Sequence, residues 1–260
     1  GRVPCITHPN GFNGLAPFIF EGPITRTVKD AALAMMALAG YDSRDPLSIK
    51  EDVDFVGATR RSIQDWKIAY SPDLDVYPVE SEVSQVVGDA ARAFEDAGAH
   101  VEEVKLGINR SQGELAELWC QLTMPINLQI LDHIKRSGPD LIGDYREDFP
   151  PEFLHWHDIA EKMSVLDFFR GNEIRTEIYH AVQDILDEYD LLVSPTLACL
   201  PVDNADDGNT KGPNEINGEK VNPLIGWCMT YFMNYSGHPA ASIPAGLSPK
   251  GLPVGMQIVG

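Results

Sequence analysis

The sequence predicts an α/β protein, and three features support this fold class. Residues 66–104 read as a strand, a helix and a second strand, the order that forms a parallel pair. The apolar run 191–196 is typical of a strand that is buried on both faces. Two further strands, at 241–244 and 253–259, close the chain after a largely helical middle third. Strands that alternate with helices in this way indicate a sheet covered by helices.

The first predicted element is a helix over residues 28–39. Thr27 and Asp30 have the spacing of a capping box, and Gly40 supplies the residue that commonly ends a helix. Lys29 and Asp30 are the only charged residues in this stretch, so we expect the helix to be buried on most sides.

The strand–helix–strand unit comes next. Strands are predicted at 66–71 and 100–104, and Gly98 ends the helix over 81–97 that joins them. The apolar residues of this helix recur on one face: Val83, Val86, Val87, Ala90, Phe94 and Ala97. This spacing predicts adjacent parallel strands with a right-handed crossover.

The middle third is predicted to be helical. Ser111 and Glu114 form a second capping box, and Pro125 is expected to kink or divide the helix that they open. After a break at Pro150, residues 159–189 carry helical periodicity, which we interpret as two helices parted near Gly171.

The last part of the chain combines a loop, a helix and the two closing strands. Residues 201–220 are polar and rich in Gly, Asn and Asp, which predicts a surface loop. Asn222 followed by Pro223 predicts the start of a helix over 223–235 that is apolar almost all round and therefore buried. Residues 248–251 have turn chemistry.

Composition limits the classes of function. The 260 residues, 43% hydrophobic and 23% charged, suit one domain that spans residues 1–260. The 39 acidic residues outnumber the 20 basic ones, and no basic cluster suits a phosphate backbone, so nucleic acid is not expected as a partner. No apolar run of about 18 residues and no signal peptide is visible, so no membrane association is expected. A homodimer is compatible with the sequence.

The cysteines and the two ends of the chain support two further expectations. The four cysteines are widely spaced without a Cys-x-x-Cys pair, which indicates reduced thiols in a cytoplasmic protein. The chain begins with Gly1 in a loop-like stretch and stops in a predicted core strand. Because natural termini rarely lie inside buried strands, we expect both ends to be cuts in a longer domain.

No complete catalytic group is found in the sequence. There is no Gly-x-Ser-x-Gly elbow, no His-Glu-x-x-His and no phosphate-binding glycine loop. His155 and His157 are interpreted as surface or packing residues, and Ser242 as a strand serine without a base beside it. We therefore predict no catalytic residue, no metal site and no cofactor within these residues.

One predicted helix face suggests a substrate pocket. Four residues share this face of helix 223–235 at spacings of three and four: Trp227, Thr230, Tyr231 and Asn234. The opposite face is expected to be core: Leu224, Cys228, Phe232 and Tyr235. Polar groups between aromatic rings suit a pocket for a small organic amide. The alternative is that the polar side chains only satisfy backbone groups nearby.

A second wall of this pocket is expected on the helix that opens at Ser111. Trp119 and Thr123 lie on it near Pro125, and we expect both to line the other side.

Four parts of the chain, in this order and at these separations, resemble the amidase-signature family. They are residues 22–46, 190–196, 234–244 and 251–260, which together span nearly the whole chain. The resemblance implies an α/β/α fold whose mixed sheet is covered by helices. It also implies hydrolysis of linear amides through an acyl-enzyme, with a serine nucleophile whose proton passes by a second serine to a neutral lysine. The resemblance places these groups upstream of Gly1, so the chain is expected to lack them.

Two departures leave the substrate open. Glu21 stands where the family pattern has Asp or His, and residues 104–190 match no particular subfamily. One alternative function is that of a glutamine-dependent amidotransferase A-type subunit. Another is a binding protein that keeps the scaffold without the nucleophile. The sequence that precedes Gly1 would separate these readings.

Overall fold

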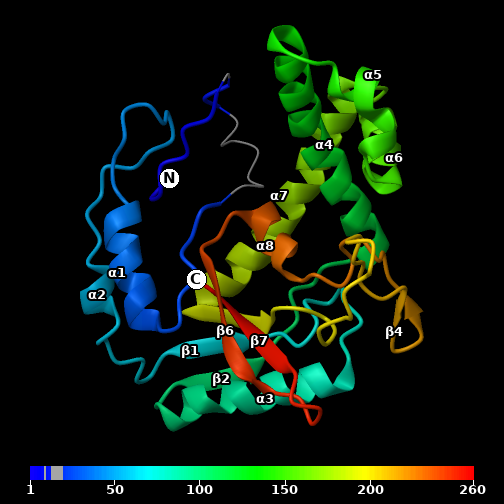
Figure 1. Ribbon diagram of the computed structural model, residues 1–260. Coiled ribbons are helices and arrows are strands. Elements are labelled where there is room, and N and C mark those ends of the chain that lie inside the picture. Colours follow the sequence, from blue (N-terminus) through cyan, green and yellow to red (C-terminus); the bar gives the residue numbers. More distant parts are fainter. Residues whose placement is uncertain (9, 13–19) are drawn as a thin grey trace. The chain divides into compact units, whose positions relative to one another are not determined.

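The computed structural model describes residues 1–8, 10–12 and 20–260 and forms two compact units. The first unit contains residues 1–62 and 123–161, and the second contains 63–122 and 162–260. The second unit holds the sheet (Figure 1). Within the described ranges, no helix is long and apolar enough to cross a membrane.

The sheet has five strands in the order β2-β1-β3-β7-β6. Their bounds are β1 Lys67–Tyr70, β2 His100–Glu103, β3 Leu191–Pro195, β6 Ala240–Leu247 and β7 Pro253–Val259. β1 runs parallel to β2 and to β3, whereas β7 runs antiparallel to β3 and β6. The predicted parallel pair is confirmed, in a register that matches Lys67 with His100, and the sheet is mixed as the resemblance implied.

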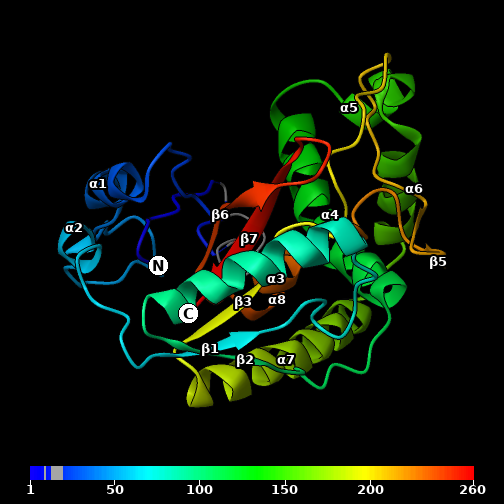
Figure 2. The same ribbon diagram turned by 90° about the horizontal axis from the view of Figure 1, so that it is seen from below.

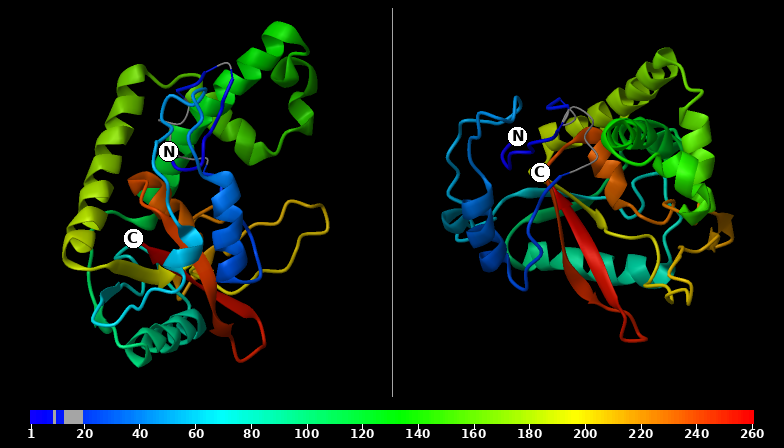
Figure 3. Two further views of the ribbon diagram at one scale, coloured as in Figure 1. Left: turned by 90° about the vertical axis from the view of Figure 1, so that its left-hand side faces the viewer. Right: turned by 45° about the horizontal axis from the view of Figure 1, so that its top comes forward.

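Helices cover both faces of this sheet. α3 (Ser81–Asp96) runs across one face and buries Val83, Val87 and Ala91 against it, as the valine pattern predicted (Figure 2). α7 (Val165–Glu188) lies on the opposite face (Figure 3). The opposite placement is expected for crossovers of the usual right hand, because those that leave β1 and β2 run in opposite directions along the sheet.

The predicted break at Gly171 is wrong. α6 (Pro151–Ala160) ends before Ser164, which opens α7 with a complete capping box, and α7 continues through Gly171. A Cβ at this glycine would lie 3.0 Å from Leu122 and 3.2 Å from Leu118. Glycine therefore serves close helix packing here and does not end a helix.

α4 (Gln112–Ser137) does not divide at Pro125. The capping box at its start is confirmed, because the carboxylate of Glu114 accepts from the backbone N–H of Ser111 at 2.8 Å. A proline in a helix interior removes one backbone hydrogen bond, but the burial of Leu122 and Met124 beside it favours a continuous helix. α5 (Leu141–Tyr145) and a 3-10 turn (Arg146–Asp148) follow.

The first unit begins with α1 (Val28–Leu38) and α2 (Phe55–Ala58). The cap of α1 is confirmed, since the Thr27 side chain accepts from the Asp30 N–H. Its predicted burial is wrong: Ala32 is the one buried residue of α1, while Val28 and Leu33 are 65% and 63% exposed. An apolar composition favours burial only where other elements cover the helix, and here they cover one narrow side.

The predicted loop 201–220 ends in a small hairpin. β4 (Glu215–Ile216) pairs with β5 (Glu219–Lys220) across Asn217 and Gly218. These two turn residues have φ values of 53° and 84°, the pattern of a type I′ turn, and Ile216 is buried below them.

The predicted helix over 223–235 is shorter than expected. α8 spans Thr230–Ser236, and residues 223–229 form turns that contain the β-bridge residue Cys228. Ala198 N donates to Trp227 O, and Leu197 forms a bridge with Cys228, so the backbone here pairs with the chain after β3. This pairing holds the backbone of Trp227 and Cys228 beside residues 197–198, so the regular helix begins only after it. The predicted burial holds for α8, although Leu224, expected in the core, is 44% exposed.

Candidate active-site wall

An aromatic cluster joins α8 to α4. The ring of Trp119 lies 5.4 Å from that of Tyr231 and 6.0 Å from that of Tyr235, measured between centroids. Tyr77, from the segment after β1, meets Tyr231 edge to face at 6.2 Å. The structure thus brings the rings of Trp119 and Tyr231 into direct contact, and that they line a substrate pocket remains a prediction.

Two members of this cluster come from positions that sequence reasoning missed. Tyr77 and Gln112 are 3% and 6% exposed, and both lie beside the equally buried Tyr231. Among the described residues, neither the Tyr77 nor the Tyr231 hydroxyl has a partner with hydrogen-bonding geometry. Burial raises the pKa of Tyr231 to about 12 and that of Tyr77 well above its ordinary value. No local pattern marks these residues, because only the fold brings them close.

Tyr235, which also contacts Trp119, anchors α8 to α4. Its hydroxyl donates to the carbonyl of Leu115 at 2.6 Å, and the side chain is 1% exposed. At the end of the helix, the guanidinium of Arg175 donates to Tyr235 O at 3.2 Å and to the side chain of Asn172. Burial lowers the pKa of Arg175 from its ordinary value. The carboxyl-terminal end of α8 is therefore held by both α4 and α7.

The predicted pocket face is divided between a turn and a helix. Thr230 and Asn234 lie four residues apart on α8, and both are half-buried. Trp227 lies in the turn before α8, where its indole Nε1 donates to Pro223 O at 3.1 Å. The hydroxyl of Thr230 lies 2.9 Å from the sulfur of Cys228. Trp227 is thus placed by turn contacts and not by helical spacing.

Thr123 belongs to the first unit, in which its carbonyl lies 3.4 Å from the amide nitrogen of Asn127. That it lines the same pocket as Tyr231 remains a prediction.

Hydroxyl and amide side chains form a polar row on the sheet. Gln257 donates to Ser194 at 3.4 Å, and both are buried. Ser242 lies on the exposed part of β6 and shares a hydrogen bond of 2.8 Å with Thr196. Because a threonine hydroxyl is too weak a base to activate a serine, Ser242 fits the strand role predicted for it.

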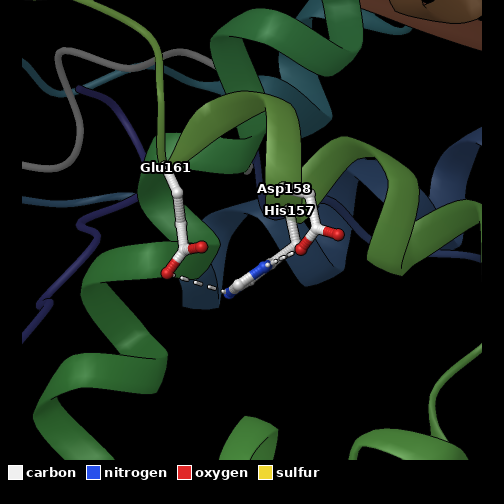
Figure 4. A group of neighbouring side chains, drawn as sticks. All are labelled: His157, Asp158 and Glu161. Atoms are coloured by element: carbon white, nitrogen blue, oxygen red, sulfur yellow. Dashed lines mark hydrogen bonds and ion pairs between the residues drawn. The ribbon is translucent and has the colours of Figure 1, made fainter.

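The two histidines singled out in the sequence have different surroundings. His155 is exposed, whereas His157 is buried on α6 between two carboxylates (Figure 4). Its Nδ1 lies 3.1 Å from Asp158, and its Nε2 lies 3.9 Å from Glu161. Arg146 also binds Asp158, at 2.7 Å, and this hydrogen bond lowers the pKa of the carboxyl.

This group could supply metal ligands, since its donor atoms lie within 4.8 Å of one another. However, the two carboxylates meet opposite edges of the imidazole, and one metal ion binds a single ring nitrogen. The arrangement fits an ion-pair network that ties α6 to the preceding 3-10 turn.

Comparison with known proteins identifies relatives over almost the whole chain. The family model described as Amidase matches residues 14–260. An acylamidase from Rhodococcus erythropolis is 32% identical over 247 residues, which cover 92% of this chain and 48% of the relative. The A-type subunit of the glutamyl-tRNA(Gln) amidotransferase from Lactiplantibacillus plantarum is 30% identical, over 92% of this chain and 50% of its own.

Solved structures show the same relationship. A bacterial aryl acylamidase of the amidase signature enzymes has a TM-score of 0.95 and 45% identity, covering all of this chain and 53% of its own. A 6-aminohexanoate cyclic dimer hydrolase, 21% identical with a TM-score of 0.74, shares the fold. This chain spans about half the length of the curated relatives that it matches. On the family match and these structures, the chain belongs to the amidase signature family.

Proposed function

We propose that residues 1–260 are part of an enzyme that hydrolyses amide C–N bonds, and that they supply its sheet scaffold and one wall of the substrate pocket. The observation that carries this proposal is the 45% identity, at a TM-score of 0.95, with a bacterial aryl acylamidase along the whole chain. The full-length enzyme is a polypeptide of the relatives' length that contains these residues.

In this proposal the chemistry follows the acyl-enzyme route that the family resemblance implies. A serine attacks the amide carbonyl while its proton passes through a second serine to a neutral lysine. The C–N bond then breaks, the amine leaves with that proton, and water hydrolyses the acyl-enzyme. These three groups come from sequence outside residues 1–260. The serines described above support this division, since Ser194 and Ser242 bond to an amide and a hydroxyl and not to a base.

The contribution of this chain is to bind and orient the substrate. Trp227, Thr230 and Asn234 are half-buried, so each has part of its side chain available to a ligand. Tyr231, beside Thr230 on α8, is buried, and its ring contacts the half-buried ring of Trp119. A flat apolar group with one polar atom suits such a wall, because the indole offers contact area and the threonine and asparagine offer hydrogen bonds.

An amidotransferase component is the second candidate function. Among the relatives, several A-type subunits of glutamyl-tRNA(Gln) amidotransferases are 27–31% identical to this chain. However, a solved structure of this type of protein is 24% identical with a TM-score of 0.59, below the values for the aryl acylamidase. The acylamidase reading is therefore favoured.

A substrate comparison tests the proposal. The full-length enzyme is assayed with p-nitroacetanilide, an aryl amide, and with glutamine in the presence of glutamylated tRNA and the partner subunits of an amidotransferase. We expect release of p-nitroaniline without any partner. Turnover of glutamine with these partners, but not of p-nitroacetanilide, would favour the amidotransferase. Turnover of neither substrate would favour the binding protein.

The origin of the nucleophile is tested by serine substitutions. Ser242→Ala should leave turnover of p-nitroacetanilide within about twofold of the wild type, because its side-chain partner among the described residues is another hydroxyl, that of Thr196. Alanine at the signature serine outside residues 1–260 should abolish turnover. The reverse pattern would contradict the proposed division of roles.

A further inference from the structure

The indole of Trp227 rests directly on the backbone of Gly212. A Cβ at Gly212 would lie 2.0 Å from the indole Nε1 and 2.1 Å from Cδ1, whereas real Cβ contacts stay above about 3.0 Å. Gly212 is not among the glycines with a positive φ, so its backbone conformation is open to alanine. Glycine is needed at this position because of the ring that packs on it.

The carbonyl of Pro223 fixes both the indole of Trp227 and the backbone of Gly212. Pro223 O accepts from the indole Nε1 of Trp227 at 3.1 Å and from the backbone N–H of Gly212 at 2.9 Å. The backbone of Trp227 is fixed as well, because its carbonyl accepts from Ala198 N at 2.9 Å. The rotamer of the indole therefore depends on where the 201–214 loop places Gly212.

The loop is itself tied to the body of the second unit at its far end. After Gly212 the chain enters the β4–β5 hairpin, where the side chain of Asn217 donates to Val79 O at 2.6 Å. Residues 201–211 are exposed, whereas Gly212 is half-buried. Gly212 is thus the point at which a surface loop meets the proposed pocket wall.

We propose that Gly212 is a positioning residue for Trp227, and that through this contact the 201–214 loop sets the selectivity of the enzyme among amides. This inference rests on the proposed function, in which Trp227 faces the substrate. Any side chain at position 212 displaces the indole of Trp227 from Pro223 O. The pocket wall then changes shape, while the polar side chains of Thr230 and Asn234 remain in it. Substrates with a large aryl group respond more than those with a small aliphatic group.

The first test compares kcat/KM for p-nitroacetanilide and for acetamide in the full-length enzyme. Gly212→Ala should change the ratio of the two values by about tenfold, since displacements on the order of 1 Å have effects of this size or larger. The matched control is Gly113→Ala, because a Cβ there has Ser111 Oγ as its nearest neighbour, at 4.0 Å. The control should leave the ratio within about twofold. An unchanged ratio in Gly212→Ala would overturn the inference.

A double-mutant cycle separates positioning from a general structural defect. Phenylalanine lacks the pyrrole edge that meets Gly212, so in a Trp227→Phe background the Gly212→Ala change should add little to the ratio. Effects that simply add would overturn the inference. If Gly212→Ala alone does not fold, the double variant should recover folding, and failure to recover would also overturn it.

A spectroscopic measurement follows the indole itself. With 5-fluorotryptophan in the full-length enzyme, the resonance that is missing in Trp227→Phe should shift in Gly212→Ala and stay in place in Gly113→Ala. A stationary resonance would overturn the inference. A wild-type enzyme without amide hydrolysis would refute the proposed function and this inference together, whereas an active enzyme with unaltered selectivity would refute the inference alone.

Discussion

The hydroxyl groups of Tyr235 and Tyr231 offer a matched test of how α8 is held. Both residues lie on α8, are 1% and 3% exposed, and pack against Trp119. They differ in one respect. The Tyr235 hydroxyl donates to Leu115 O at 2.6 Å, whereas that of Tyr231 has no partner with hydrogen-bonding geometry in the described part of the chain.

Phenylalanine at each position removes one oxygen and leaves the ring. A buried hydrogen bond contributes about 0.5–1.5 kcal/mol net, and this short one should lie near the upper end. Leu115 is in α4, so its carbonyl keeps a helical partner and the loss is confined to the tyrosine bond. Tyr235→Phe should therefore destabilise the protein by about 1–1.5 kcal/mol. Tyr231→Phe should cost less than about 0.5 kcal/mol, since it removes a buried polar atom without a partner.

The assay is thermal unfolding of the two full-length variants under identical conditions. Because unfolding entropy grows with chain length, we expect Tyr235→Phe to lower Tm by about 1–3 °C and Tyr231→Phe by less than about 1 °C. Equal decreases, or a larger decrease for Tyr231→Phe, would refute the assignment of the anchoring bond.

Three other predictions concern the pocket, the cysteines and the isolated chain. Thr230→Leu should change the ranking of amides by kcat/KM with little change in Tm, and an unaltered ranking would indicate that this face is only core. Burial raises the pKa of Cys120 to about 12 and that of Cys199 to about 11, so both thiols stay protonated at pH 8. They should react slowly with iodoacetamide in the native protein and rapidly after unfolding, and rapid native labelling would contradict this. Residues 1–260 expressed alone should not hydrolyse arylamides, because the proposed nucleophile lies outside them. They should also not unfold cooperatively, because apolar side chains of α1 such as Leu33 are exposed. A sharp calorimetric transition would disprove the stability half, and turnover removed by mutating a serine in this span would disprove the catalytic half.

The amino-acid sequence by itself determined most element types, through local chemistry. The N-cap of Thr27 and the capping box of Ser111 start α1 and α4 as predicted, because each depends on residues three positions apart. The valine pattern of α3 and the apolar run of β3 likewise predicted burial correctly. Helix caps and apolar patterns can be predicted from the sequence because they depend on residues that are close together in it.

Tertiary contacts decided where these elements stop and what covers them. Pairing of Trp227 and Cys228 with residues 197–198 delays α8 to Thr230, although the local sequence favours an earlier start. Gly171 lies inside α7 because close packing, and not chain reversal, required a residue without a side chain.

The candidate site shows the same division. Helical spacing was enough to group Thr230, Tyr231 and Asn234 on one element. Tyr77, Gln112 and Gly212 join them from distant segments, and no periodicity links these positions. Residues far apart in sequence share a site only after the sheet and its crossovers fix the distances between them, which is why the folded chain alone places the indole of Trp227.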